Sequence, residues 1–311
     1  MKRTRFIPST AEGFTLAEVL IVVAIIGLLA SIVLVGLRGN QEEARLAKGQ
    51  SFDAQIYHAL GSEVVGSWML DDGSEYTEGS TLKTRDVSGY GNDGTLFNVS
   101  LAADRAGQAN KAYWFNGQTS PPGASRITLS NLFSSLDGLL QSGFSASLWF
   151  NADSFGQSSA GRFLMRTNDN TNKGFDLHWE DAQSGRIRLI IDFDTTDGRW
   201  RTTNIIPNPL NTWHHLVATY DGGTAVGSVQ IYVDGTKIPV TRATNPSGIT
   251  TNIPSIPLQI GAFGSGQFPR TFHGTIDDVR VYSRILTAQE IMQYYAETAP
   301  AYLLAAESGS L

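Results

Sequence analysis

The chain has 311 residues, of which 41% are hydrophobic and 17% charged, a balance typical of a globular protein with room for one large or two small domains. Its net charge of -6 argues against a nucleic-acid partner. It contains no cysteine, which excludes disulfides, thiolate metal sites and cysteine nucleophiles.

An apolar segment follows a short basic leader at the start of the chain. The leader, residues 1–13, carries three basic residues and one acidic residue. The 19 residues Val19–Leu37 contain no charge and would form a helix roughly 28 Å long, about the thickness of a bilayer core. No small-residue cleavage site follows the apolar segment. Hydropathy alone therefore predicts an uncleaved single-pass anchor whose basic end lies in the cytoplasm.

The string that opens this segment, Gly13-Phe14-Thr15-Leu16-Ala17-Glu18, resembles the type IV prepilin signal. The resemblance implies that a prepilin peptidase cuts between Gly13 and Phe14 and that Phe14 is N-methylated. It also implies a leader over residues 1–13 and a pilin-type helix over residues 14–61, of which 14–37 spans the membrane. Such a helix sits in membrane lipid first and is then taken up by the pilus assembly machinery among other pilin subunits.

Glu18 is the single charge between residues 14 and 37, and carboxylates inside a membrane are costly and usually functional. It lies one turn into the helix, where it can neutralise the amine that cleavage creates on Phe14. That amine can belong to the same chain or to a neighbouring copy. The resemblance implies the neighbour, so that Glu18 helps to set the register of assembly.

From Val64 the hydrophobic pattern changes to period two, and short strands separated by turn residues are expected. The clearest hairpin is Val229–Val240, where Asp234-Gly235 supplies a tight turn. One later helix is indicated by a capping box, Thr287 with Glu290. We also expect strands over 111–116, 126–130, 144–151, 162–166, 174–180, 186–193 and 274–282. The predicted fold is therefore α+β: a long N-terminal helix, an antiparallel β-sandwich over residues 62–297 and a flexible tail over 298–311.

Several motifs in the sandwich region resemble those of laminin-G-like, concanavalin A-like domains. In chain order they are Gly66-Ser67-Trp68, Asp86–Leu96, Phe144–Phe150, Trp213–Gly222, Ile231–Gly235 and Gly274–Tyr282. The resemblance covers residues 64–295 and implies a jelly roll of two packed sheets.

A metal site is one hypothesis for this domain. Asp86, Asn92, Asp93 and Asp277 are oxygen donors in glycine-rich turns, and calcium takes six to eight oxygen ligands. Several members of the resembled family hold a structural calcium between the first loop and the aspartate of the last strand. These four residues are therefore the expected calcium ligands. The alternative is that the first three only stabilise turns and that Asp277 ends a strand.

Catalysis is not expected. His214 and His215 are adjacent, so in a strand they point to opposite faces and cannot form one cluster. A glycanase needs two carboxyl groups at a set separation, and neither Trp179-Glu180-Asp181 nor Asp192-Phe193-Asp194 supplies the pattern.

The combined pattern predicts a pilin-like subunit of a type IV pilus or related filament. Its lectin-like head would serve adhesion or surface recognition of a glycan or a surface protein. The chain would lie in the cytoplasmic (inner) membrane with the head outside the cytoplasm, and then in an extracellular filament. Two alternatives stay open: a pseudopilin of a type II secretion system, and a surface-anchored enzyme that processes glycans.

Overall fold

The computed structural model describes residues 63–118, 123–129, 138–167, 174–180, 185–250, 257–262, 270–300 and 303, together with Leu16, Val19, Leu20, Ile21, Val23 and Ile25. The chain divides into two compact units, Met1–Lys48 and Gly49–Leu311. In the first unit the six described residues are helical and their apolar side chains are exposed. Within the described residues, no helix is both long enough and apolar enough to cross a membrane.

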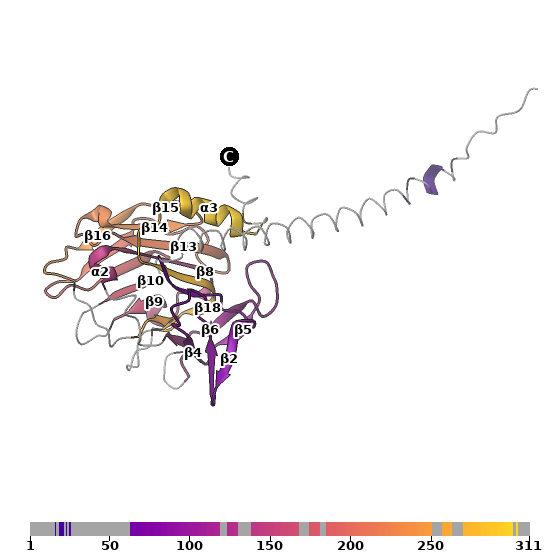
Figure 1. Ribbon diagram of the computed structural model, residues 1–311. Helices are drawn as coiled ribbons and strands as arrows, with labels where there is room; N and C mark the ends of the chain where they lie inside the picture. The colour runs from indigo at the N-terminus through magenta and orange to yellow at the C-terminus, as the bar shows by residue number, and fades with distance from the viewer. Residues whose placement is uncertain are drawn as a thin grey trace, which may run out of the picture. The chain divides into compact units, whose positions relative to one another are not determined.

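The second unit is built on two antiparallel sheets packed face to face (Figure 1). The eight-stranded sheet has the order β15-β14-β13-β8-β18-β6-β5, and β1 also pairs with β18. Its strands are β1 Val64–Trp68, β5 Ser100–Ala102, β6 Ala112–Asn116, β8 Phe144–Ser154, β13 Trp213–Tyr220, β14 Val229–Val233, β15 Thr236–Ile238 and β18 His273–Tyr282.

The ten-stranded sheet has the order β16-β12-β11-β10-β9-β17-β7-β4-β3-β2. Its strands are β2 Glu75–Glu78, β3 Thr81–Thr84, β4 Gly94–Phe97, β7 Arg126–Leu129, β9 Arg162–Arg166, β10 Phe175–Trp179, β11 Ile187–Ile191, β12 Gly198–Thr202, β16 Val240–Thr244 and β17 Gln259–Ile260. The α-helices described in this unit include the short α2 Leu139–Ser142 and α3 Ala288–Thr298, and two single-turn 3-10 helices are η2 Gln157–Ser159 and η3 Val226–Ser228.

One large core lies between the sheets because apolar side chains alternate along the inner strands. In β10, Phe175, Leu177 and Trp179 all belong to this core. Leu177 pairs with Leu189 of β11, so the apolar faces of neighbouring strands are in register. Burying each such side chain contributes about 1.5–3 kcal/mol, so this core is the main source of stability.

The start and the end of the domain lie side by side. β1 pairs with β18, with Val64 opposite Tyr282, and the backbone N–H of Ser283 donates to the carbonyl of Glu63 at 2.7 Å. The first and last strands of the domain are thus hydrogen-bonded to each other.

Two local predictions are confirmed. β14 and β15 form the expected hairpin, and its turn residues Asp234 and Gly235 both have positive φ, 53° and 74°, as a type I′ turn requires. Thr287 caps α3, and Glu290 completes the capping box.

α3 packs on the outer face of the eight-stranded sheet (Figure 1). Its Tyr295 stacks on Trp149 of β8 with ring centroids 5.8 Å apart. The helix continues to Thr298, and Ala299 and Leu303 are buried with Trp149. The packed domain therefore extends beyond the expected boundary at residue 297, because apolar side chains of the tail cover Trp149.

Candidate functional site

The residues predicted for processing and assembly, Gly13, Phe14 and Glu18, lie outside the described residues. The nearest described side chains belong to the same apolar segment. Between 49% and 80% of each is exposed in the single chain; they are Leu16, Val19, Leu20, Ile21, Val23 and Ile25. Apolar surface of this extent on one helix has a favourable environment only in lipid or against other apolar helices.

Three of the four predicted calcium ligands meet in one loop. Asp86 Oδ1 accepts hydrogen bonds from the backbone N–H groups of Ser67 and Ser88, at 3.0 and 2.9 Å, and its Oδ2 accepts from the N–H of Asn92 at 2.9 Å. Asp93 Oδ1 accepts from the N–H of Asp86 at 2.8 Å. The two carboxylates thus have partners within the protein.

Asn92 fastens the same loop to the core. Its side-chain amide donates to the backbone carbonyl of Val65 at 2.9 Å. The backbone carbonyl of Asn92 accepts from the indole N–H of Trp68 at 2.9 Å. Both contacts are buried, so the loop holds β1 in place and satisfies polar atoms that burial would otherwise leave unpaired.

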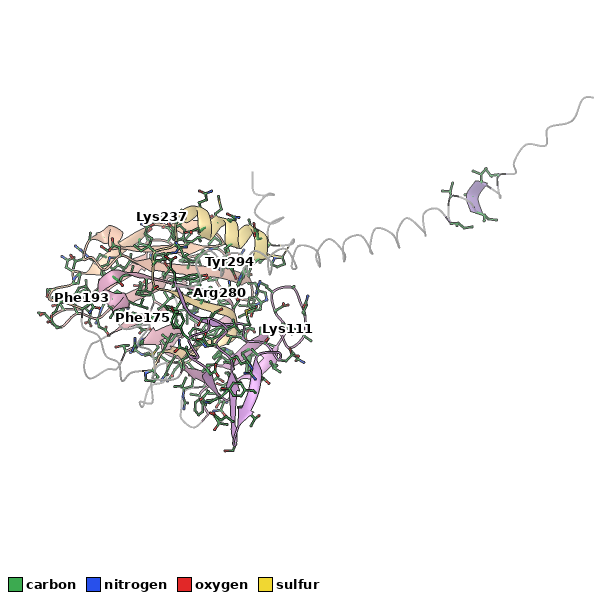
Figure 2. All side chains as sticks on the ribbon, viewed as in Figure 1. Lys111, Phe175, Phe193, Lys237, Arg280 and Tyr294 are labelled. Atoms are coloured by element: carbon green, nitrogen blue, oxygen red, sulfur yellow. The ribbon has the colours of Figure 1, made fainter. Side chains whose placement is uncertain are left out.

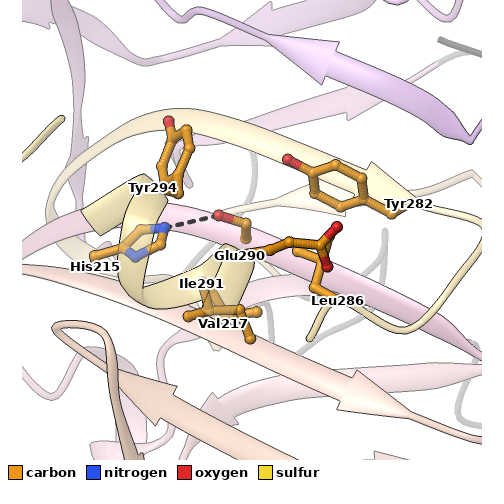
Figure 3. A pocket seen from close by; sticks show the side chains of 8 residues that line it. His215, Val217, Tyr282, Leu286, Glu290, Ile291 and Tyr294 are labelled. Carbon is orange, nitrogen blue, oxygen red and sulfur yellow. Dashed lines mark hydrogen bonds between the residues drawn. The ribbon is translucent and has the colours of Figure 1, made fainter. Parts of the chain in front are cut away.

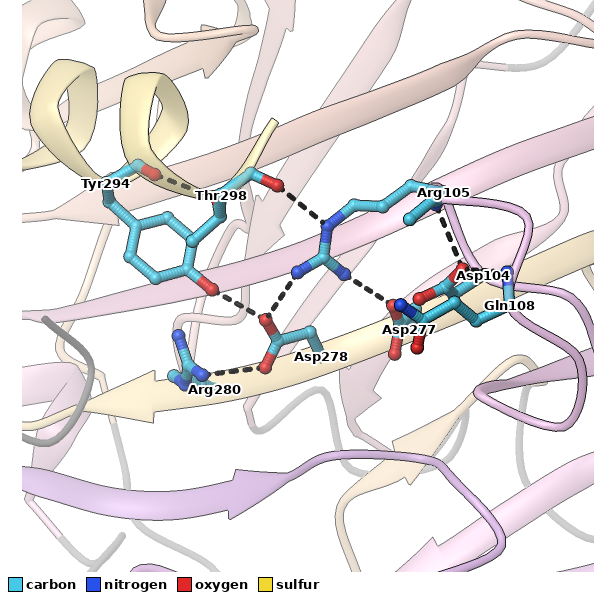
Figure 4. A network of polar contacts seen from close by, with 9 residues as sticks. Asp104, Arg105, Gln108, Asp277, Asp278, Arg280, Tyr294 and Thr298 are labelled. Atoms are coloured by element: carbon cyan, nitrogen blue, oxygen red, sulfur yellow. Dashed lines mark hydrogen bonds and ion pairs between the residues drawn. The ribbon is translucent and has the colours of Figure 1, made fainter. Parts of the chain in front are cut away.

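Asp277, the fourth predicted ligand, lies in a different network (Figure 4). Its Oδ2 forms an ion pair with Nη1 of Arg105, whose Nε donates to the carbonyl of Thr298 at 3.2 Å. The adjacent Asp278 pairs with Arg280 at 2.7 Å. In the described part of the chain no three His, Cys, Asp or Glu side chains are grouped as metal ligands. Calcium binding stays a prediction.

The network around Asp277 and Asp278 is buried and charged, which separates the pKa values of its two carboxyls. Burial raises the pKa of Asp277, and the charge of Asp278 adds to the rise. Burial acts against the charged form of Asp278 too, but Arg280 and Arg105 together hold its pKa below the ordinary value. The guanidinium of Arg280 on β18 also lies 5.0 Å from the ring centroid of Tyr294 on α3, and both residues are labelled in Figure 2.

His214 and His215 point to opposite faces, as predicted. His214 lies against Phe150 of the core and its Nδ1 is 2.7 Å from Oδ2 of Asp234. His215 faces α3, and its Nε2 is 2.9 Å from the hydroxyl of Ser147. Burial lowers the pKa of His215 to about 3, so its imidazole is neutral at physiological pH.

A small cavity lies between α3 and the outer face of the eight-stranded sheet (Figure 3). It has room for roughly one water molecule and none for a sugar. Its lining residues are Ser147, His215, Val217, Tyr282, Leu286, Glu290, Ile291 and Tyr294.

A second cluster of charged side chains lies on the outer face of the ten-stranded sheet. The sequence analysis named its Glu180 only in the test for a glycanase and did not predict the cluster. Because Phe175, Leu177 and Trp179 face the core, the alternate residues Asp176 and His178, and Glu180 directly after the strand, face outward. The sequence signal was present as an alternation of polar residues within the strand expected over 174–180.

Asp176 and His178 form one part of this cluster. Nε of Arg162 is 2.8 Å from Oδ2 of Asp176, and Nδ1 of His178 is 3.2 Å from its Oδ1. Burial opposes ionisation of Asp176, but Arg162 and His178 lower its pKa. Burial, with Arg162 nearby, lowers the pKa of His178. Asp176 is therefore an ionised carboxylate held by an arginine.

Glu180 forms the other part. Its carboxylate is bound by Arg188 at 2.8 Å and by Arg201, and Nη1 of Arg186 lies 3.8 Å away. Arg188 and Arg201 are opposite each other on β11 and β12. We call this surface the arginine face and define it by the outward residues Arg186, Arg188, Arg199 and Arg201.

Profiles of two known protein families match the chain. The profile of the concanavalin A-like lectin/glucanases superfamily matches residues 122–292, more than half of the chain. The chain belongs to that superfamily. A second profile, the prokaryotic N-terminal methylation motif, matches residues 9–34 and contains Gly13, Phe14 and Glu18. The chain thus joins a prepilin-type N-terminus to a concanavalin A-like domain.

Solved structures with the same fold include a domain of an arabinanase and the binding domains of two toxins. Domain 4 of AbnA, a GH43 extracellular arabinanase from Geobacillus stearothermophilus solved with arabinotriose, is 22% identical, with a TM-score of 0.52 over 75% of this chain and 98% of that one. The binding domain of botulinum neurotoxin DC, solved with rat synaptotagmin II, is 13% identical, with a TM-score of 0.53 over 77% of this chain and 52% of that one.

A third example is the binding domain of Paraclostridial Mosquitocidal Protein 1, which is 16% identical, with a TM-score of 0.52 over 76% of this chain and 52% of that one. The match spans about half the length of the two toxin domains. At these identities the likeness establishes the sandwich fold alone. No curated protein sequence matches the chain.

Proposed function

We propose that the protein is a pilin-like subunit of a type IV pilus or related filament and that its concanavalin A-like head binds a ligand outside the cytoplasm. The observation that carries the proposal is the order of the two parts. A prepilin-type methylation motif at residues 9–34 precedes a domain whose superfamily includes lectins.

The chemistry of the N-terminus supports assembly into a fibre. Cleavage after Gly13 would leave a charged amine on Phe14 at the edge of the membrane. Glu18 would then be a carboxylate within an apolar helix, where an unpaired charge is costly. Pairing between the amine of one subunit and Glu18 of the next removes both costs. The exposed side chains of Leu16, Val19 and Leu20 would contact lipid before assembly. In the fibre core they would pack against the helices of other subunits.

The head is proposed to bind without turnover. A glycoside hydrolase needs one carboxyl to donate a proton and a second to act as a base or nucleophile. The two outward carboxylates Asp176 and Glu180 are instead held by arginines, Asp176 by Arg162 and Glu180 by Arg188 and Arg201. This arrangement engages both carboxylates in ion pairs with arginines and suits a rigid binding surface.

Repetition along a fibre would strengthen weak binding by each head. Linking many copies raises apparent affinity by about 10²-fold or more when the geometry allows simultaneous contact. A weak affinity of the single chain is therefore compatible with adhesion.

The test is a glycan array probed with the detergent-solubilised chain and with purified filaments, followed by a hydrolysis assay on the same glycans. We expect retention of filaments on a subset of glycans, weaker retention of the single chain and no released sugar. Reproducible sugar release would contradict binding without turnover, and absence of retention in both forms would contradict a glycan-binding head.

A further inference from the structure

One of the six tryptophans of the chain differs from the others in its burial. Five indole rings are packed inside the domain and are at most 8% exposed; they belong to Trp68, Trp149, Trp179, Trp200 and Trp213. Trp114 on β6 is only half-buried. Its neighbours Tyr113 and Phe115 belong to the core, so the alternation of side chains along the strand turns Trp114 to the outer face of the eight-stranded sheet. Its indole offers apolar surface that a ligand can cover.

Polar contacts hold the indole of Trp114 in one orientation. Its Nε1–H donates to Oδ2 of Asp153 on β8 at 2.9 Å. The ring lies edge-on to the imidazole of His273 on β18, with centroids 5.8 Å apart and an angle of 70° between the planes. Nδ1 of His273 is in turn 2.9 Å from the hydroxyl of Ser154. Side chains that are fixed before binding lose little conformational entropy when a ligand arrives, so this ring is a preorganised contact surface.

Polar side chains surround the ring on two neighbouring strands. Thr275 of β18 lies opposite Trp114, Asn151 of β8 lies opposite Thr275, and all three residues are half-buried. Oδ1 of Asn151 is buried and has no hydrogen-bond partner in the described part of the chain. Among the described residues, the contacts of the Asp153 carboxylate with Trp114 and with Nε2 of His273, at 3.6 Å, both use Oδ2, which leaves Oδ1 as an acceptor.

We call this surface the Trp114 site and define it by Trp114, Asn151, Asp153, His273 and Thr275. The side chains of Asp153 and His273 are 41% and 34% exposed, so a ligand can reach them. The site lies next to the part of the outer face that α3 covers, because Asn151 is the alternate residue after Trp149 on β8 and Trp149 stacks on α3. The helix therefore covers one part of this face and leaves the Trp114 site at the surface.

A sugar ring fits this combination of groups. One face of a pyranose carries C–H groups, which pack against an indole, while its edge carries hydroxyls, which both donate and accept hydrogen bonds. Asp153 supplies an acceptor, and the side chains of Asn151 and Thr275 can donate and accept. The charge of Asp153 would repel an anionic ligand. Cages for organic cations surround the ligand with several aromatic rings, and the Trp114 site presents one indole.

We propose that the Trp114 site binds a neutral glycan, with one sugar ring stacked on the indole and the sugar hydroxyls bonded to Asp153, Asn151 and Thr275. The inference rests on the proposed function of the head as a binding domain, and it names the site and the class of ligand.

The first experiment uses Trp114 as its own reporter. The full-length, detergent-solubilised chain is mixed with dextran, mannan, xylan, polygalacturonate or tetramethylammonium, and quenching of its tryptophan fluorescence by acrylamide is measured. Because the other five indoles are buried, most of the quenching comes from Trp114. We expect at least one of the three neutral polysaccharides to lower the quenching constant towards that of Trp114→Phe, and polygalacturonate and tetramethylammonium to leave it unchanged.

Variants separate this site from the rest of the head. Trp114→Ala should weaken retention of the same polysaccharide about tenfold or more, because the stacking surface is lost. Asp153→Asn should weaken retention about threefold, because a neutral amide oxygen accepts a weaker hydrogen bond than a carboxylate.

Tyr90→Ala is the matched control and should leave retention unchanged. Tyr90 is an exposed aromatic residue in the loop that contacts β1, and β1 pairs with the end of β18 opposite to His273. Thermal unfolding of each variant shows whether it folds, and the protection of Trp114 in the wild-type chain does not depend on any variant.

The outcomes distinguish the site from the head's general role. Retention of a neutral polysaccharide that Trp114→Ala leaves unchanged, without protection of Trp114 from acrylamide, would reject this site and place glycan binding elsewhere on the head. Protection by polygalacturonate or tetramethylammonium but by no neutral polymer would reject the ligand class. Failure of all three neutral polymers to bind would reject the inference, and the glycan array then decides separately whether the head binds another glycan.

Discussion

The hydroxyl of Tyr294 on α3 donates a hydrogen bond of 2.6 Å to Oδ2 of Asp278 on β18. Both side chains are buried, and Asp278 is also paired with Arg280. The bond joins α3 to β18, an inner strand of the eight-stranded sheet between β8 and β6. Its acceptor is charged, which makes it one of the stronger types of hydrogen bond in a protein.

Replacing Tyr294 by Phe should therefore lower the free energy of unfolding by about 1.5–3 kcal/mol, measured by denaturant titration. Tyr232→Phe is the matched control, because its hydroxyl donates to the neutral side chain of Gln230 at 2.8 Å. The control should cost about 1 kcal/mol or less. Equal costs for the two variants would contradict a special role for the bond to Asp278.

His215 should make stability depend on pH. Burial lowers its pKa from 6.5 to about 3 in the folded chain, so between these values only the unfolded chain binds the proton. The free energy of unfolding therefore falls as the pH falls below 6.5, by at most about 1.4 kcal/mol per pH unit. This contribution is complete above pH 6.5 and is lost progressively towards pH 3.

The variant His215→Gln removes the titrating group and isolates its contribution. The difference in unfolding free energy between wild type and variant should become smaller when the pH is lowered from about 7 to about 4.5, because only the wild type loses the contribution of His215. The other titrating groups are present in both proteins and cancel in this difference. Denaturant titrations at the two pH values measure it. A difference that does not change with pH would show that His215 is not a neutral buried imidazole.

The sequence-based prediction of calcium requires that calcium raise the Tm of the full chain relative to chelator. Saturation at a hundredfold excess over Kd would add about 2.7 kcal/mol. Asp277→Ala should abolish the difference if Asp277 leaves Arg105 to bind the ion. An unchanged Tm would reject calcium and leave Asp86, Asn92 and Asp93 as a turn held by its own hydrogen bonds.

Local features of the head could be predicted from sequence because short-range chemistry determines them. The Asp234-Gly235 turn follows from two residues that tolerate positive φ, and the start of α3 follows from Thr287 and Glu290. The positions of several strands along the chain, such as β8 and β18, also follow from local alternation.

Contacts between distant segments could not be predicted in the same way. Arg105 and Asp277 are separated by 172 positions, and their ion pair depends on how a loop after β5 returns to β18. The arginine face depends on the register that places Arg188 opposite Arg201. Burial of Leu303 required knowledge that Trp149 faces outward beneath α3. Each feature is set by tertiary packing, which no local pattern encodes.

Glu18→Ala tests the assembly step. Membrane insertion should be unchanged or improved because a charge is removed from the apolar segment, while incorporation into filaments should fall because the amine on Phe14 loses its partner. The measurement is the ratio of filament to membrane protein in sheared cell fractions. Glu12→Ala is the control, since the proposed cleavage after Gly13 would remove Glu12 with the leader. Normal incorporation of Glu18→Ala would show that Glu18 does not set the register.

The most direct test of the whole account is the N-terminus of the protein in filaments sheared from cells that possess the peptidase, determined by mass spectrometry. The account predicts a mature chain that begins at N-methyl-Phe14 and is found in the filament fraction. A chain that retains Met1 or Lys2 and stays in the membrane fraction would contradict it and leave a plain membrane anchor for the head.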